Sequence, residues 1–263
     1  MLNKSQQKLS QLFIFIVILA TTGLTPSTAL SREYTSEQAS KILRAVDDLW
    51  RGDSSHAITR MQVKTKHYTR TMRMEGWSKG KEMTLIRVLT PLKEKGTITL
   101  KTGNTIYTYL PKTDRRIRLT SGMMMGSWMG SHLTNDDLVK EARLEDDYVA
   151  SISFEGVRDG QNILEFTLIP KPEAAVVWGK LVLIVLAESS IPVREDYYDE
   201  DMGLTRSIRF TDMKFLGGKQ RPAIMRVVPA DKPDEFTEFV YESLELNVPL
   251  KDSFFSASNL KKH

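Results

Sequence analysis

The stretch TSGMMMGSWMGSHLTNDD, which runs from Thr120 to Asp137, separates two series of strand-like segments in this chain. Its glycines disfavour both a strand and the interior of a helix, because glycine loses the most backbone freedom on folding. Five of its side chains are nevertheless large and apolar, namely Met123, Met124, Met125, Trp128 and Met129. Apolar side chains on so flexible a backbone predict a movable lid over an apolar surface, and we interpret these five residues as its gate.

Short segments on both sides of this stretch have the composition of β-strands, and turns rich in glycine, asparagine and proline separate most of them. Before the stretch they are residues 57–66, 68–78, 81–89, 96–101, 105–110 and 115–119. After it they are residues 148–157, 161–169, 181–187, 192–198, 204–215, 223–228 and 235–246. Strands at this spacing predict one curved antiparallel meander of about a dozen strands.

Only one strong helix is expected to cover this sheet. Its apolar positions recur at helical spacing and are Ala39, Ile42, Leu43, Val46, Leu49 and Trp50. Thr35 with Gln38 fits a capping box at its start, and Gly52 fits a C-cap at its end. A weaker helix is expected over residues 138–144, after a second cap signal formed by Thr134 and Asp137. So few helices predict a concave sheet face that is only partly filled, and the unfilled part is an apolar ligand cavity.

The residues expected to line this cavity come from the first helix and from strands in both series. They are Ile42, Val46, Trp50, Met72, Met74, Leu85, Leu100, Leu183 and Val185. In residues 71–77, Met72 and Met74 alternate with charged side chains, which indicates one apolar and one solvated face. Which alternation of each strand faces the cavity stays open. Methionine is flexible and polarisable, so the gate methionines suit contact with variable acyl chains.

The first 29 residues have the three-part pattern of a secretory signal peptide. Lys4 and Lys8 precede the apolar run LFIFIVILA, and small residues lead up to Ala29. This run is far shorter than the ~20 residues that span a bilayer. Cleavage near Ala29 would leave one domain, residues 30–263. Because the chain has no cysteine, it has no disulfide, no thiolate metal site and no cysteine for lipid attachment. We therefore expect an exported protein in the periplasm.

Charge and motifs argue against several classes of function. The net charge is only +4, and Lys4 and Lys8 of the expected leader contribute two of these charges, so nucleic acid is not an expected partner. No nucleophile elbow, paired-histidine helix or phosphate loop is present, so we expect no enzyme and no cofactor. We also expect the protein to be a monomer. An alternative interpretation of the methionine-rich stretch is a Cu(I) site, since thioether and imidazole ligands suit this ion. Its candidate ligands are Met123, Met124, Met125, Met129 and His132.

Three stretches resemble the LolA-like family, the periplasmic outer-membrane lipoprotein-sorting proteins. They are MMMGSWMGSHLTNDDLVKE at 123–141, IPVREDYYDEDMG at 191–203 and VPLKDSFFSASNL at 248–260. The resemblance covers nearly all of residues 30–263. It implies a mainly β fold with helices, namely an incomplete antiparallel β-barrel of about eleven strands with a helical lid over an apolar cavity.

The resemblance also implies a function. Proteins of this kind carry acylated lipoprotein or lipid cargo between membranes, which implies an inner-membrane transporter and an outer-membrane acceptor as partners. A periplasmic sensor of the same fold, which binds lipid or lipoprotein in order to signal, is the alternative reading.

Overall fold

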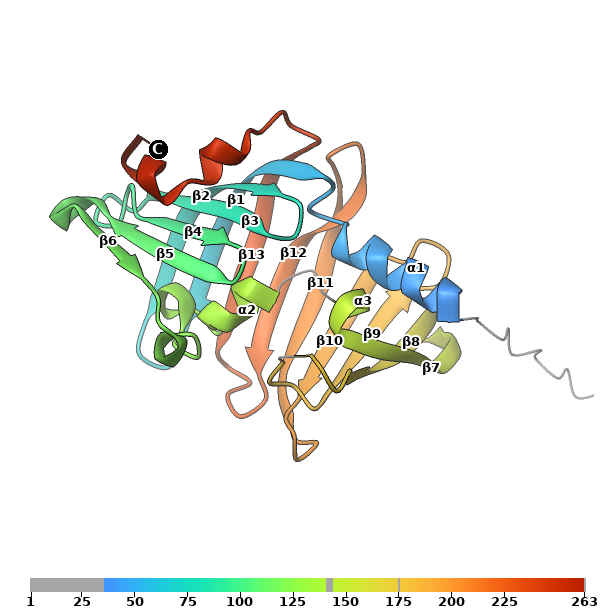
Figure 1. Cartoon of the computed structure of the whole chain (residues 1–263). Coiled ribbons are helices and arrows are strands. Elements are labelled where there is room, and N and C mark those ends of the chain that lie inside the picture. The colour runs from blue at the N-terminus through green and yellow to red at the C-terminus, as the bar shows by residue number, and fades with distance from the viewer. Residues whose placement is uncertain (1–35, 141–143, 175, 263) are drawn as a thin grey trace, which may run out of the picture. The chain divides into compact units, whose positions relative to one another are not determined.

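Thirteen antiparallel strands form one continuous sheet that curls without closing into a barrel (Figure 1). The order along the sheet is β6-β5-β4-β3-β2-β1-β13-β12-β11-β10-β9-β8-β7. Strands that are consecutive in sequence pair with each other, apart from β6 and β7, which do not pair. One further pairing, between β1 and β13, joins the two series of strands. Strands β6 and β7 follow each other in the chain and are nevertheless the two opposite edges of the sheet. The connection between them must therefore pass from one edge to the other.

The computed structural model describes residues 36–140, 144–174 and 176–262, all within the unit Glu33–His263. The first series of strands is β1 (Ser54–Lys64), β2 (Thr69–Lys79), β3 (Met83–Thr90), β4 (Ile98–Thr102), β5 (Thr105–Leu110) and β6 (Arg115–Arg118). The second is β7 (Tyr148–Arg158), β8 (Gln161–Pro170), β9 (Lys180–Leu186), β10 (Pro192–Tyr198), β11 (Leu204–Leu216), β12 (Lys219–Pro229) and β13 (Phe236–Leu246). The predicted leader and the predicted cap residue Thr35 lie outside the described residues. No helix in the described part of the chain is long and apolar enough to cross a membrane.

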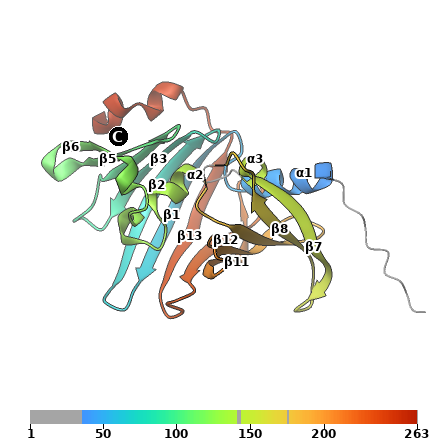
Figure 2. The ribbon, with the colours of Figure 1, turned by 60° about the horizontal axis from the view of Figure 1, so that its bottom comes forward.

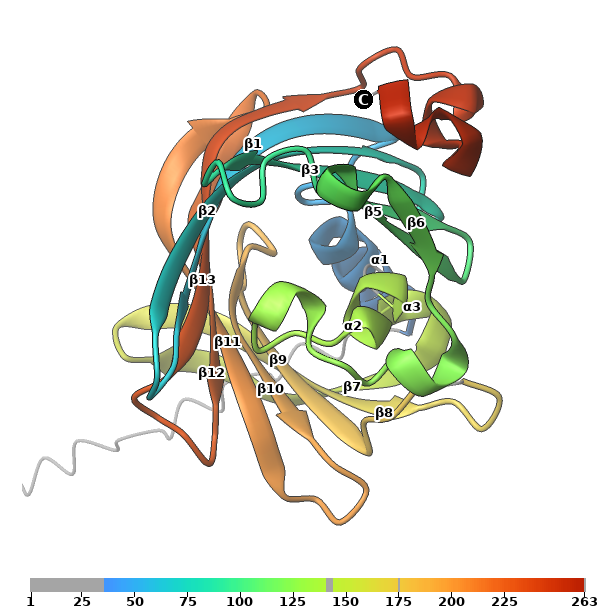
Figure 3. The ribbon, with the colours of Figure 1, turned by 90° about the vertical axis from the view of Figure 1, so that its left-hand side faces the viewer.

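The helices are few and short. They are α1 (Ser36–Asp47), α2 (Asn135–Lys140), α3 (Leu144–Asp147) and the 3₁₀ helices η1 (Pro111–Thr113), η2 (Ser121–Met123), η3 (Trp128–Gly130), η4 (Asp252–Phe255) and η5 (Ala257–Lys262). Figure 2 shows α1 beside β7 and β8, and α2 on the side of β1 and β2. Figure 3 shows α2 and α3 inside the curl of the sheet. We call residues 119–140, which leave β6 and include η2, η3 and α2, the strap.

Helix α1 fills the concave face over β7–β9. Ala39, Leu43 and Val46 lie on one side of the helix, at helical spacing, and are almost fully buried. They pack in one cluster with inward-facing residues of β8 and β9, including Phe166 and Leu183. Burial of this apolar stripe, rather than helix propensity, holds a helix of this length in place.

The C-terminal segment covers part of the convex face. Phe255 and Leu260 pack against Leu85 of β3 and Leu100 of β4. Successive strand residues point to opposite faces, and the neighbours of Leu85, Thr84 and Ile86, point into the concave side. The sheet therefore buries apolar side chains on both faces in this region.

The predicted elements agree with the observed ones apart from their number and limits. Each of the thirteen strands overlaps a predicted segment, whereas the resemblance implied about eleven strands. The first helix ends at Asp47 instead of continuing through Trp50, because the chain turns and Gly52 adopts a positive φ of 54°. Within the described residues, the second predicted helix corresponds to α2 and to the start of α3, and its residues 141–143 lie outside them. Its predicted cap is present, since Thr134 Oγ1 accepts the Asp137 backbone N–H at 3.1 Å.

We predict that Val46→Asp destabilises the fold strongly, by about 3 kcal/mol or more, because it places an unpaired charge in the cluster under α1. Lys41→Asp, on the exposed side of the same helix, should change the free energy of unfolding by less than about 0.5 kcal/mol. Thermal or urea unfolding of both variants measures this. Equal losses would show that α1 packs on the sheet through a different face.

Candidate ligand cavity

A cavity of about 310 Å³ lies between α1, the strap and the concave face of the sheet. Its walls come from both series of strands. Met74 and Ile86 contribute from the first series, and Phe210, Met225 and Tyr241 contribute from the second. Pockets of this kind, mostly apolar with a few polar groups, are the usual form of a small-molecule site.

Trp50 is the centre of an aromatic wall. Its ring stacks on Phe210, with 5.3 Å between centroids, and on Tyr241, with 6.2 Å. Its Nε1 donates a hydrogen bond to the Pro222 carbonyl oxygen at 3.3 Å. Trp50 lies in the turn that follows α1, three residues after the helix ends.

The strap roofs the cavity through Trp128, which is 4% exposed. The Trp128 ring stacks on Phe239 of β13 at 6.3 Å, and its Nε1 donates to Thr99 Oγ1 of β4 at 3.1 Å. Met129 and Leu133 of the strap pack into the same apolar cluster. The roof is thus anchored on β1–β4 and on β13, away from the strands that α1 covers.

The five residues predicted as a gate divide into two groups. Trp128 and Met129 point into the apolar cluster, whereas Met123 and Met125 are 45% and 58% exposed. Met124 is half-buried. The five residues therefore do not form one buried group, since Met123, at the end of η2, and Met125, just after it, face solvent.

Three of the residues predicted to line the cavity do so, namely Val46, Trp50 and Met74. Met72 is fully buried on the same face but lies in the cluster under Trp128, outside the cavity wall. Leu183 and Val185 also face inward, but α1 covers them.

The remaining three belong elsewhere. Ile42 packs at the margin of the α1 cluster and does not line the cavity. Leu85 and Leu100 point to the convex face, under the C-terminal segment. The prediction that Leu85 and Leu100 line the cavity is therefore wrong. Apolar alternation alone did not distinguish the two faces, because both faces of β3 and β4 are covered.

A buried ion pair joins the strap to the opposite wall. The Arg206 guanidinium of β11 donates two hydrogen bonds of 2.7 Å to the Asp137 carboxylate of α2. The same guanidinium lies over the rings of Trp178 and Tyr197, at 4.6 Å and 4.4 Å from their centroids. Burial alone would raise the pKa of Asp137, but the Arg206 contacts outweigh it and lower the pKa. Removing one partner of such a pair would leave an uncompensated buried charge.

Two further carboxyl groups face the cavity. Glu195 of β10 is 8% exposed and accepts a hydrogen bond from the Tyr197 hydroxyl at 2.7 Å. Asp47, at the end of α1, accepts the Leu144 backbone N–H at 3.1 Å and so links α1 to α3. Burial raises the pKa of Glu195. Burial also raises the pKa of Asp47 to about 7, while Lys81 opposes this rise and Glu195 adds to it.

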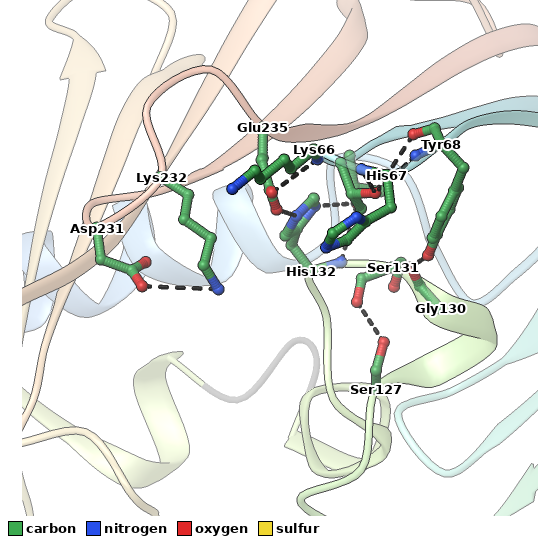
Figure 4. A network of polar contacts seen from close by, with 12 residues as sticks. Lys66, His67, Tyr68, Ser127, Gly130, Ser131, His132, Asp231, Lys232 and Glu235 are labelled. Carbon is green, nitrogen blue, oxygen red and sulfur yellow. Dashed lines mark hydrogen bonds and ion pairs between the residues drawn. The ribbon is translucent and has the colours of Figure 1, made fainter.

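A second polar contact holds the end of the strap near the rim of the sheet (Figure 4). The His132 backbone N–H donates to Thr237 Oγ1 at 2.9 Å. The His132 ring contacts the same hydroxyl through Nδ1 at 2.8 Å and the Glu235 carboxylate through Nε2 at 3.2 Å. The Tyr68 hydroxyl donates to the Gly130 carbonyl oxygen at 2.9 Å. The strap is therefore attached to the β1–β2 turn, the β12–β13 turn and the start of β13.

The positions of the candidate Cu(I) ligands do not favour a Cu(I) site. Its candidate ligands are dispersed, since Met129 packs in the apolar cluster while Met123 and Met125 face solvent. Both ring nitrogens of His132 have hydrogen-bond partners. Among the described residues, no group of three or more histidine, aspartate or glutamate side chains is arranged to hold a metal ion.

The polar residues of the cavity were not predicted from the sequence. Asp137 was interpreted only as a helix cap, and Glu195 lies in a stretch that was used only for the resemblance. The signal that could have revealed Glu195 is the run of three consecutive charged residues, Arg194 to Asp196, in β10. Successive strand residues point to opposite faces, so at least one of the three must point to the concave face. Arg206 has no such signal, because its partner lies 69 residues away in the chain.

A family model described as "Uncharacterized protein" matches residues 80–262. The chain belongs to this family. No curated protein matches the chain. Solved structures of similar fold include a DUF1329 family protein from Desulfovibrio piger, with a TM-score of 0.74, 23% identity and coverage of 86% of this chain and 98% of that one.

Two other solved structures are also similar to this chain in fold. An outer membrane lipoprotein-sorting protein domain from Vibrio parahaemolyticus has a TM-score of 0.71 and 22% identity, over 86% of this chain and 100% of that one. A LolA superfamily protein from Nitrosomonas europaea has a TM-score of 0.69 and 22% identity, over 84% and 98%. The fold of the family member described here is therefore LolA-like, which confirms the resemblance predicted from the sequence.

We predict that Asp47→Asn stabilises the protein in a pH-dependent way. The pKa of Asp47 is about 7 in the folded chain and near 3.8 in the unfolded chain. Between pH 3.8 and pH 7 the folded chain therefore keeps the Asp47 proton, while the unfolded chain has lost it. Wild-type stability should therefore fall as pH rises through this window. The variant lacks this loss and should be more stable by roughly 1–3 kcal/mol at about pH 8, and equal at about pH 4.

Thermal unfolding at both pH values measures the effect, with Asp48→Asn, the exposed neighbour, as the control. A gain that is the same at both pH values would contradict the assigned pKa.

Proposed function

We propose that this protein is a periplasmic carrier that holds acyl chains of a lipoprotein or lipid in the cavity and moves them toward the outer membrane. One observation carries the proposal. The segment that joins the two edge strands passes over the concave face and roofs an apolar cavity with Trp128. A cavity closed by a segment attached along its rim can be opened without unpairing any strand of the sheet.

The strap is the part proposed to move, and α1 stays in place. Three consecutive turns of α1 bury apolar residues in the sheet. The strap combines short 3₁₀ turns with exposed glycines at Gly122, Gly126 and Gly130. Segments with few buried apolar contacts open at the lowest free energy, and binding gates are drawn from them.

The size of the cavity supports such an opening. Its volume of about 310 Å³ lies at the lower end of the range for ligand pockets, about 300–1,000 Å³. The closed form therefore accommodates one short chain or part of a longer one. Displacement of Trp128 would join the cavity to the apolar cluster of Met61, Met72 and Phe239, over which the ring now lies. In this proposal, the acyl chain takes over the apolar contacts that Trp128 and Met129 make in the closed form.

Two polar attachments define the closed form. The Arg206–Asp137 pair fixes α2 to β11, and the His132 contacts fix the strap to the start of β13 and to the turn before it. Both attachments are directional and buried or half-buried, so they restore one closed geometry after the cargo leaves. The partners proposed by resemblance are an inner-membrane transporter and an outer-membrane acceptor, and the protein acts as a monomer without catalysis or cofactor.

We predict that a covalent lock on the strap blocks uptake. His132→Cys with Thr237→Cys places two cysteines at positions in direct contact, and the chain has no cysteine that could compete. Uptake of the neutral apolar dye N-phenylnaphthylamine, followed by its fluorescence, should slow roughly tenfold or more in the oxidised protein. Reduction should restore the rate of uptake, and each single-cysteine variant treated with oxidant is the control. Equal rates in the oxidised and reduced double variant would mean that the strap is not the gate.

We also predict that the exposed methionines act in uptake and contribute little to stability. Met123→Ser with Met125→Ser should change the free energy of unfolding by less than about 0.5 kcal/mol, because both side chains are already largely exposed. The same change should slow dye uptake, since these side chains are the first apolar surface that an incoming chain meets. The matched control is Met202→Ser with Met213→Ser, two exposed methionines outside the strap. Equal slowing in the control pair would remove any specific role for the strap methionines.

A further inference from the structure

The charged groups around the cavity are mostly negative. Among the described residues that line it, five are acidic and two are basic. Both basic residues are already engaged. Arg206 donates two hydrogen bonds to Asp137, and Arg51 donates to the Gly80 carbonyl oxygen and to Thr84 Oγ1. A ligand therefore meets an excess of carboxyl groups inside an apolar, aromatic cavity.

Glu195 is the carboxyl group that is best placed to meet a ligand. It is more than nine-tenths buried and lines the cavity. Tyr197 donates to Oε2, while Oε1 has no hydrogen-bond partner among the described residues. Asp47 lies near enough for the two negative charges to repel, and Arg206 only partly offsets the charge on Glu195. Burial raises the pKa of both carboxyl groups more than Lys81 lowers it at Asp47 and Arg206 lowers it at Glu195, which is the direction expected where the countercharge is incomplete.

We propose that the cavity selects amphiphiles with a cationic amine head group, and that Glu195 receives the ammonium while the apolar walls hold the chain. This inference rests on the proposed function, because it assigns a ligand class to the same cavity. An ammonium group donates hydrogen bonds to a carboxylate, and the aromatic faces that line the same cavity, such as Trp50, can add cation–π attraction. A fatty-acid carboxylate would instead meet like charge. The cavity should therefore bind amine-bearing lipids in preference to free fatty acids.

The experiment compares three amphiphiles with the same chain and different heads, namely dodecylammonium, dodecanol and dodecanoate. Each is titrated below its micelle concentration against delipidated full-length protein loaded with N-phenylnaphthylamine, and displacement of the dye gives the affinity. Dodecylammonium should bind about tenfold more tightly than dodecanoate or better, with dodecanol in between.

Glu195→Gln tests the assigned residue. The amide oxygen still accepts the Tyr197 hydroxyl, so the side chain keeps its place while losing its charge. The variant should lose most of the preference for ammonium and keep its affinity for dodecanol within about twofold. Glu188→Gln, at an exposed position before β10, is the matched control and should leave all three affinities unchanged. If Glu195→Gln melts before the assay temperature, Asp47→Asn replaces it, with a smaller loss of preference expected.

The outcomes separate this inference from the proposed function. Equal affinity for the three heads, or tighter binding of dodecanoate, would overturn the inference while leaving an acyl-binding cavity. A preference for ammonium that persists in Glu195→Gln would overturn the role of Glu195. Absence of dye binding and of displacement by any of the three would overturn the proposed function and this inference together.

Discussion

The chain must connect two opposite edges of one sheet, and this constraint determines the rest of the structure. Because β6 and β7 are consecutive in sequence but lie at the two ends of the strand order, their connection has to cross the open side of the curl. A crossing segment without apolar side chains would leave the concave face of β1–β3 in water. Trp128, Met129 and Leu133 meet this requirement, and the glycines between them let a short segment turn often enough to do so. The methionine- and glycine-rich composition is thus a consequence of topology.

The two halves of the concave face are covered by different means, and the cavity is what remains between them. Helix α1 packs on β7–β9 by continuous apolar burial, while the strap lies on β1–β3 and is fixed by a few directional contacts. The Arg206–Asp137 pair bridges the halves across the cavity. A buried ion pair adds little net stability but fixes geometry, because each ion is costly without its partner. The same arrangement leaves Glu195 without a cation of its own, so the ion pair that holds the roof closed also leaves the cavity with an excess of carboxyl groups.

The sequence predicted the parts of the structure that depend on local pattern. Strand segments, the α1 stripe and the Thr134–Asp137 cap follow from spacing and turn chemistry, and the glycine-rich stretch indicated a cover. Which side chains of a strand point to the concave face was harder to predict. Leu85 and Leu100 have the same apolar alternation as Met72 and Met74 but lie under the C-terminal segment on the convex face. The polar site depends on contacts between distant residues. Arg206 finds Asp137 only after the strap has crossed the sheet, so no local pattern contained that pair.

The central claim is that the strap opens and α1 does not. Hydrogen–deuterium exchange measured by mass spectrometry tests it directly, on delipidated protein with and without saturating dodecanol. If the strap is the moving part, exchange should change in peptides covering residues 119–138, while peptides of α1 and of β8 and β9 exchange equally in the two states. A change confined to residues 36–47, or no change in the strap when dodecanol is bound, would show that the strap is not the part that opens.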